Sequence, residues 1–358
     1  MPIPSISSHH FRDRDVFQDE MSRIYVTLGH IQPPDGIISV LKYLPDVTGQ
    51  WESGNIRYRR IFSNDVVSSH TGMEILPNEY YDDTHFGTDI LKFPVSKVVH
   101  YFKPEERLKQ IINEGPNDEL ERIVSKLACS FHDILDIPFD QLGVTGSIAW
   151  NAHNPSFSDI NMNIHGFDWS WYLEENYPRL VQEDSSLQLT EGALWANSVS
   201  RLRERIVCLG SDEILVLFKR RRQLQFHQQP ITIMPVLNPS ESPIEYGTEK
   251  YNSTFLVKAE VEITSSRYGI FFPALYEVVG TAESTRSSIS VTRLMIYDGA
   301  FRGLFQDGDI LQVHGTLQKV QRLDGSSFFQ IMIGTLAGAG KEHIIITKPS
   351  QSYQEATR

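Results

Sequence analysis

The segment between positions 143 and 166, GVTGSIAWNAHNPSFSDINMNIHG, contains residue types that can hold a phosphate chain and a metal ion. Gly146 and Ser147 form a glycine–serine pair, and such a pair at the start of a helix offers backbone N–H groups and the positive dipole end to an anion. Asp159 and Asn161 stand two positions apart, so in a strand their side chains share one face. Carboxylate and amide oxygens are ligands that Mg²⁺ accepts. This combination is what a metal-dependent phosphoryl transfer requires.

Local signals predict the elements that position these residues. Residues 143–145 indicate a very short strand, and Gly146 begins a short helix that ends at Asn154 and Pro155. Residues 158–164 alternate in polarity, which indicates a second strand. We therefore expect the turn and the Asp-x-Asn strand to face each other across a cleft, with Ser147 at a helix N-terminus.

Helices and a further strand are expected around this segment. Pro104, followed by two glutamates, begins a helix, because proline and acidic residues suit the first turn. An apolar stripe at helical spacing over 120–135 predicts a second helix, with Asn117 as its N-cap. Helical periodicity returns over 193–226, and residues 230–236 indicate a strand that contains no acidic residue.

The two ends of the chain are rich in strand signals. The first hundred residues contain short runs of β-branched and aromatic residues, separated by the turn at 33–36. Residues 257–263 and 309–320 alternate in polarity, and Asp324-Gly325 predicts a hairpin. A glycine at position 315 allows a strand to bend around a small barrel of the oligonucleotide-binding kind.

Three domains are therefore expected in an α+β chain of 358 residues, a length that exceeds one ordinary core. They are a β-rich N-terminal domain (1–100), a mixed domain of sheet and helices (101–245), and an antiparallel β-barrel-like, oligonucleotide-binding-like domain with a polar tail (246–358).

The composition is that of a globular protein, with 40% hydrophobic and 22% charged residues. The longest apolar runs are too short for a membrane span, and the N-terminal residues lack the pattern of a secretory signal. We expect a cytoplasmic protein with no membrane partner. Cys129 and Cys208 lack companions at zinc-ligand spacing, so free thiols are expected.

The net charge of −12 argues against a general nucleic-acid coat, so a polyanion must bind at a local basic patch. One patch contains Arg57, Arg59 and Arg60, which are expected to be half-exposed strand residues. The other is a run of four basic residues that begins with Lys219 and Arg220. It fits a solvated helix face and, equally, a surface that reaches a triphosphate or a nucleic-acid backbone.

The Gly-Ser and Asp-x-Asn pattern resembles the signature of the polymerase-beta-like nucleotidyltransferase superfamily, and in particular a largely archaeal family of predicted nucleotidyltransferases. Further stretches are similar to landmarks of that family and extend the resemblance over most of residues 12–346. These stretches are PPDG (33–36), LKYLPD (41–46), KPEERL (103–108), EYGTEKY (245–251) and FPALY (272–276). The resemblance implies a polymerase-beta-like nucleotidyltransferase core in the central domain.

The resemblance also implies roles for individual residues. Gly146 and Ser147 match the turn that holds the triphosphate, and Asp159 matches the first metal-binding carboxylate. Asn161 stands where the family has a second aspartate, so one negative charge is missing from the expected Mg²⁺ (or Mn²⁺) site. The superfamily usually draws a third carboxylate from a later strand, and the strand at 230–236 offers none.

Three functions stay open at this point. The first is a nucleotidyltransferase with a weakened metal site, which would move a nucleoside monophosphate from an NTP to a hydroxyl acceptor through Asp159 and Asn161. The second is a module that binds a nucleotide, RNA or DNA without turnover. The third is a structural or partner-binding protein that kept only the fold. Whether the chain is an enzyme, and in which oligomeric state it works, does not follow from the sequence.

Overall fold

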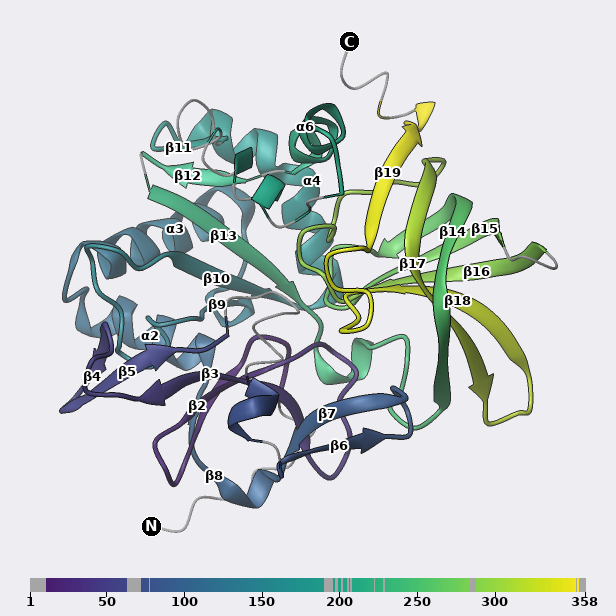
Figure 1. Ribbon diagram of the computed structural model, residues 1–358. Helices are drawn as coiled ribbons and strands as arrows, with labels where there is room; N and C mark the ends of the chain where they lie inside the picture. Colours follow the sequence, from purple (N-terminus) through teal and green to yellow (C-terminus); the bar gives the residue numbers. More distant parts are fainter. Residues whose placement is uncertain are drawn as a thin grey trace.

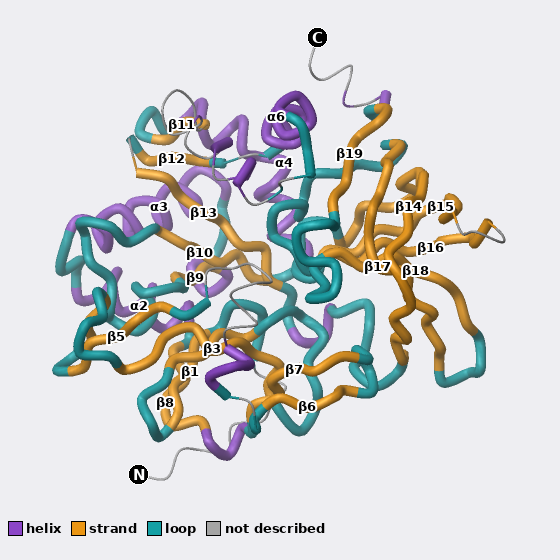
Figure 2. The backbone as a smooth tube through the Cα atoms, in the orientation of Figure 1, coloured by secondary structure: helices purple, strands orange, loops and turns teal. Residues whose placement is uncertain are grey.

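The chain folds as a mixed α+β structure with three sheets, shown as a ribbon in Figure 1 and as a tube coloured by secondary structure in Figure 2. This computed structural model describes residues 11–62, 72–76, 78–189, 196, 199–200, 202–204, 206, 208–221, 223–227, 229–283, 288–351 and 353. The three sheets draw their strands from 16–102, 142–236 and 249–348, in the order of the three expected domains. Within the described residues, no helix has the length and apolar character needed to cross a membrane.

The first sheet is antiparallel throughout and is organised around one long strand, β3 (Ile37–Pro45), which pairs with β2, β5 and β7. A largely apolar run with the β-branched residues Ile37, Ile38 and Val40 makes β3 a strand that is mostly buried. The other strands are β1 (Val16–Asp19), β2 (Ile24–Thr27), β4 (Trp51–Ser53), β5 (Ile56–Arg60), β6 (Tyr80–Asp83), β7 (Thr88–Phe93) and β8 (Val98–Phe102), with a 3-10 turn, η2 (Val95–Lys97), before β8.

Helices α2 (Pro104–Glu114), α3 (Glu119–Leu135) and α4 (Phe167–Glu183) pack against the central sheet. The first two form where the apolar spacing and the early proline predict them. The expected N-cap Asn117 is wrong by one residue, because the Asp118 carboxylate accepts the Glu121 N–H at 3.0 Å. Asn117 instead donates to the Glu121 carboxylate.

The central sheet has the order β11-β12-β13-β10-β9, and its core strand β10 (Ile160–His165) runs parallel to β13 (Gln229–Val236). Ile160, Met162 and Ile164 point into the core shared with the helices. Asn161 therefore lies on the opposite face, away from the helices. The remaining members are η3 (Phe139–Gln141), β9 (Leu142–Val144), β11 (Leu187–Leu189) and β12 (Leu224–Phe226).

The segment after β9 differs from the expected short helix. Residues 146–151 form consecutive turns, closed by a hydrogen bond of 2.9 Å from the Ala152 N–H to the Ser147 carbonyl. Ser147 is thus on a tight turn and not at a helix N-terminus. Of the helix expected within 193–226, the structure describes α6 (Ser211–Arg220), and most of 190–207 lies outside the described residues.

The third sheet is curled, because the 20-residue strand β14 (Glu249–Tyr268) pairs with β15 along one part and with β17 along another. Strand β16 runs parallel to β18, and the predicted Asp324-Gly325 hairpin joins β17 to β18. Its other strands are β15 (Ala274–Glu283), β16 (Ser288–Ile296), β17 (Ile310–Arg322), β18 (Ser327–Ile333) and β19 (His343–Lys348), after the short 3-10 helix η4 (Pro239–Glu241).

Packing crosses the sequence ranges of the three sheets. Helix α6, which precedes the last two strands of the central sheet, buries Ile214, Leu217 and Phe218 in the core of the curled sheet. Trp150, from the turn after β9, packs with the first sheet against Tyr43 and Tyr58. The three sheets therefore meet closely, and the polar face of β10 looks into the junction between them.

Candidate functional site

The turn at Gly146 and the strand β10 are held together by the backbone. The Thr145 N–H donates to the Asn161 carbonyl at 2.9 Å, which brings Gly146 beside the Asn161 side chain. Gly146 has φ +69°, and a Cβ added to it would lie 3.2 Å from Asn161 Nδ2. Both the conformation and the close approach require glycine here.

The structure brings all four residues of the predicted motif around one small pocket of about 90 Å³, lined by Gly146, Ser147, Asp159 and Asn161 among others. Ser147 is buried, Asn161 is half-buried, and Asp159 is exposed at the rim. The two parts of the motif therefore face each other, as the sequence predicts. Their roles toward phosphate and metal remain predictions.

Three cations from the N-terminal part of the chain also line this small pocket. They are Lys42 on β3, Arg60 at the end of β5, and Arg14 in the loop before β1. Burial, together with the neighbouring guanidinium groups of Arg60 and Arg14, lowers the pKa of Lys42 to about 7, and the Asp159 carboxylate opposes that shift. Among the described residues, neither Lys42 nor Arg60 makes an ion pair with a carboxylate.

Arg14 has an unusual backbone for an arginine, with φ +69°. Hydrogen bonds from its N–H to the Thr27 carbonyl (3.0 Å) and from the Thr145 hydroxyl to its own carbonyl (2.8 Å) hold it there. A non-glycine residue in the left-handed region costs conformational energy, and such residues concentrate at functional sites. The Arg14 side chain lines both the small pocket and the larger cavity beside it.

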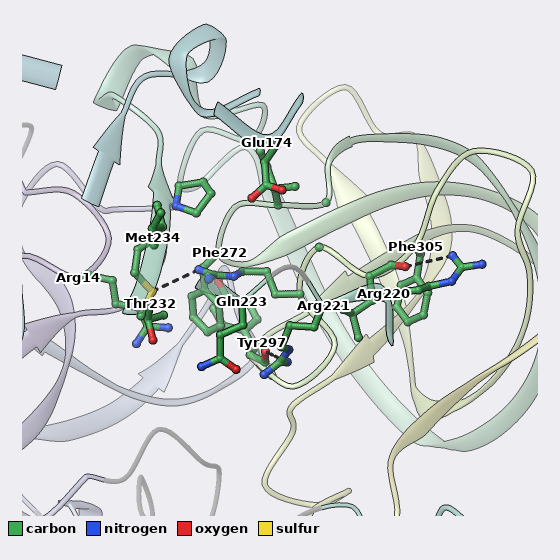
Figure 3. Close-up of a pocket in the computed structure, with 18 of the residues that line it drawn as sticks. Arg14, Glu174, Arg220, Arg221, Gln223, Thr232, Met234, Phe272, Tyr297 and Phe305 are labelled. Atoms are coloured by element: carbon green, nitrogen blue, oxygen red, sulfur yellow. Dashed lines mark hydrogen bonds between the residues drawn. The ribbon is translucent and has the colours of Figure 1, made fainter. Parts of the chain in front are cut away.

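A second and much larger cavity, of about 1280 Å³, adjoins the small pocket, and we call it the central cleft. Arg14, Asp159, Asn161 and Met234 line both spaces, so the small pocket opens off the cleft at these residues. Figure 3 shows Arg14, Thr232 and Met234 together at one end of the cleft, with Arg220 and Phe305 at the other. Residues from all three sheets line it.

Arg302, from the loop between β16 and β17, adds a fourth cation at the Arg14 end of the cleft. Its Nη1 lies 3.5 Å from Met234 Sδ, a weak acceptor. Burial and the neighbouring Arg14 guanidinium lower the pKa of Arg302, while Asp13 and Glu174 act in the opposite direction. Asp13 is the nearest balancing carboxylate of Arg14 as well, with Oδ2 3.4 Å from Arg14 Nε.

The carboxylates that the family resemblance leads us to expect for a metal site are not all present. Thr232 on β13 pairs directly with Asn161 on β10, and neither residue carries a charge. The described part of the chain contains no cluster of three or more His, Cys, Asp or Glu residues arranged to hold a metal ion. Asp159 is therefore the one carboxylate of the small pocket. Cations and not carboxylates dominate this pocket.

Arg220, predicted as a phosphate ligand, instead makes a buried ion pair. Its two terminal nitrogens donate to the Asp309 carboxylate at 2.5 and 3.1 Å, and Tyr353 covers the guanidinium at 4.0 Å. Both side chains are almost fully buried. Lys219 is exposed and lines the far part of the cleft, and Arg222 lies outside the described residues. Arg220 thus has a structural partner that a ligand would have to displace.

Arg57, Arg59, His153 and His165 line neither of the two cavities. Arg57 and Arg59 are exposed on β5, and Arg59 pairs with Asp46 at 2.8 Å. His153 Nε2 lies 2.7 Å from the Asp118 carboxylate. His165 is buried on β10, and burial holds its pKa well below the usual range, so it is neutral.

Sequence reasoning missed Arg14, Lys42 and Arg302 as site residues. One signal was available for Lys42, since it is a lone charge within IISVLKYLP, a run that otherwise suits a buried strand. Arg14 and Arg302 carry no such signal, because their position depends on contacts between distant parts of the chain.

Comparison with known proteins adds no assignment to this geometry: no protein-family model, no curated protein and no solved structure matches the chain.

Proposed function

We propose that the chain binds a nucleoside triphosphate, or a small molecule with a similar phosphate chain, in the central cleft, with the phosphates directed to the small pocket. The observation that carries the proposal is that Arg14, Lys42 and Arg60 line the small pocket together with the Gly146 turn, while Arg302 lines the adjoining central cleft. Partly buried cations with too few carboxylates are costly unless an anion binds among them.

The same charge balance favours binding over metal-dependent transfer. In-line transfer on two Mg²⁺ ions uses several carboxylates to hold both ions. Here Asp159 is accompanied by the neutral residues Asn161 and Thr232. Cations supplied by the protein can neutralise a triphosphate directly, as arginine and lysine do in other phosphate sites.

Two features of the fold support the family resemblance behind this proposal. The parallel pair β10 and β13, with helices on one face and the Asp-x-Asn residues on the other, is the arrangement that a polymerase-beta-like core requires. The pairings β14-β15-β16-β18-β17-β14, with β16 parallel to β18, follow a five-stranded ring like that of oligonucleotide-binding barrels. We propose both relationships on these grounds.

Nucleotidyl transfer is the second candidate function, favoured by one observation: Asp159 lines the same small pocket as the Gly146-Ser147 turn. A single carboxylate can hold one Mg²⁺ together with oxygens of the triphosphate itself.

Calorimetric titration of the full chain with ATP, GTP, CTP and UTP, each in EDTA and in Mg²⁺, tests the proposal. We expect binding in EDTA at micromolar to submillimolar dissociation constants. Failure of all four nucleotides to bind would refute it. Incubation with α-labelled NTPs and hydroxyl acceptors, including the protein itself and RNA, then tests the second candidate. Transfer of label in Mg²⁺ would establish an enzyme.

A further inference from the structure

We infer that the small pocket is a subsite for a single phosphoryl group, in which Lys42, flanked by Arg14 and Arg60, supplies the positive charge that a second metal ion would otherwise give. This inference rests on the proposed function and specifies where the phosphates bind and what neutralises them.

The size of the two spaces separates their roles. The small pocket, of about 90 Å³, has less than a tenth of the volume of the central cleft and suits a phosphoryl group better than a nucleoside. The central cleft of about 1280 Å³ has room for a base, a sugar and further phosphates. A phosphate chain can therefore run from the cleft into the small pocket past Arg14 and Asp159, which line both.

The charges that face Lys42 come from each element packed around it. Arg60 lies on β5, Arg14 lies in the loop before β1, and Asp159 lies at the start of β10. Tyr43, the chain neighbour of Lys42, also lines the pocket, and burial raises its pKa to about 12, so it stays neutral. Asp13 already balances part of the Arg14 charge, so together with Asp159 it leaves a net positive charge of about one when Lys42 is protonated. This charge favours an anionic phosphoryl group.

Protonation of Lys42 should then control affinity. In the free protein its pKa is about 7, so part of the population has a neutral amine at neutral pH. A bound phosphoryl group favours the ammonium, and binding takes up a proton. Above pH 7 the affinity falls by up to roughly tenfold per pH unit, because the proton must be acquired from an increasingly basic solution. Ionisation of the phosphate, with a second pKa near 6, acts in the opposite direction and mainly below pH 7.

The test measures binding of inorganic triphosphate, inorganic phosphate and ATP to the full chain in EDTA from pH 6 to pH 9. Three variants accompany the parent: Lys42→Met removes the charge, Lys42→Arg keeps it at every pH, and Lys97→Met is a control at an exposed lysine outside both cavities. Circular dichroism melts verify that each variant is folded.

For the parent and for Lys97→Met we expect triphosphate affinity to fall at least tenfold between pH 7 and pH 9. Lys42→Met should bind at least tenfold more weakly at pH 6.5 and show a nearly flat profile. Lys42→Arg should keep its affinity up to pH 9. Because the phosphate titrates equally in all variants, the difference in pH profile between the parent and Lys42→Arg reports the titration of Lys42 alone. If inorganic phosphate binds and neither ATP nor triphosphate does, the small pocket is a site for free phosphate. If ATP or triphosphate binds much more tightly than inorganic phosphate, the pocket holds the terminal phosphoryl group of a longer chain.

The outcomes separate this inference from the proposed function. If ATP binds but Lys42→Met has the parent's affinity and pH profile, the nucleotide site stands and the Lys42 subsite is wrong. If the folded variants bind no phosphate compound in EDTA and all bind ATP when the titration is repeated in Mg²⁺, metal and not Lys42 neutralises the phosphates. If no phosphate compound binds to the parent, both proposals fall.

Discussion

Two groups of basic side chains in this molecule differ in whether they have partners within the protein. At the end of α6, the Arg220 guanidinium meets the Asp309 carboxylate in a buried pair, and the neighbouring Arg221 donates to the carbonyls of Gly299 and Ala300. Around the small pocket, Lys42 and Arg60 have no carboxylate partner among the described residues, although Arg60 donates to the Phe62 carbonyl. Arg14 pairs with Asp13, and Arg302 in the adjoining cleft reaches a thioether. The first group completes the fold, whereas we propose that the second binds an anion.

The difference shows that density of charge in the sequence is a poor guide to a binding site. The four consecutive basic residues from Lys219 form the most conspicuous cluster in the chain, yet the most buried arginine among them is used for stability. The cations that remain available are single residues from separate elements. The experiments below test whether the two groups do behave in opposite ways.

The largest effect is expected from Arg220→Met, which leaves Asp309 as an unpaired buried carboxylate. Loss of one partner of a buried ion pair typically costs about 3–5 kcal/mol. We expect the free energy of unfolding to fall by this amount, as measured by urea or thermal melts. Lys219→Met, its exposed neighbour, is the control and should change stability by less than about 0.5 kcal/mol. Unchanged stability with weaker ATP binding would assign Arg220 to the ligand site after all.

Arg14→Met and Arg302→Met should each weaken ATP binding about 10- to 100-fold, because each removes a charge-assisted contact worth roughly 1.5–3 kcal/mol. Arg302→Met should reduce stability by no more than about 1 kcal/mol, since its guanidinium lies near the Arg14 guanidinium. Arg14→Met should reduce stability by more than this, since it removes the ion-pair partner of the buried Asp13 carboxylate. Calorimetry and thermal melts on the same samples check both values. A variant that melts early and still binds ATP normally would contradict the division into two groups.

Lys42→Met should stabilise the ligand-free protein, and more so in acid. The pKa of Lys42 is lowered in the folded state, so its charge opposes folding fully below pH 7, and the cost disappears as pH rises toward the value of an unfolded lysine. We expect a gain on the order of 1–2 kcal/mol at pH 6 and a smaller gain at pH 9, after allowance for solvent screening. Destabilisation at pH 6 would mean that Lys42 has a structural partner.

The smallest effect is expected from Asn161→Asp, which restores a charge at nearly constant volume. The added carboxylate should weaken ATP binding in EDTA by about three- to tenfold and allow Mg²⁺ to recover it, since two carboxylates then face the pocket. Asn161→Ser, which adds no charge, is the control. If Mg²⁺ affinity does not change, the Asp159 and Asn161 side chains do not act on one ion.

Local signals predicted the elements of the site well. The alternation over 158–164 predicted β10, the apolar stripe predicted α3, and the close approach at Gly146 follows from a glycine–serine turn next to a strand. The error at 146–151 arose because a turn and the first turn of a short helix share the same residue preferences.

The chemistry of the pocket could not be predicted in the same way, because it depends on contacts between distant parts of the chain. Nothing near Arg220 in the sequence announces Asp309, which lies 89 residues further on. Equally, no sequence signal near Asp159 predicts its proximity to Lys42. Lys42 lies on β3 of another sheet, and the pairing of β3 in that sheet brings it to the pocket. Hydrophobic periodicity predicts which face of a helix or strand a residue occupies. It does not predict which other element packs against that face.

The wide separation of the site residues along the chain has a kinetic consequence. Arg14 lies near the start of the described chain and Arg302 lies between two strands of the curled sheet, so the complete set of site residues comes together only after all three sheets have assembled. If the folding transition state forms before the curled sheet docks, the complete site does not yet exist in that state. A ligand that requires the complete site then cannot bind to the transition state. Such a ligand leaves the refolding rate unchanged and lowers the unfolding rate alone, by the full factor of its equilibrium stabilisation.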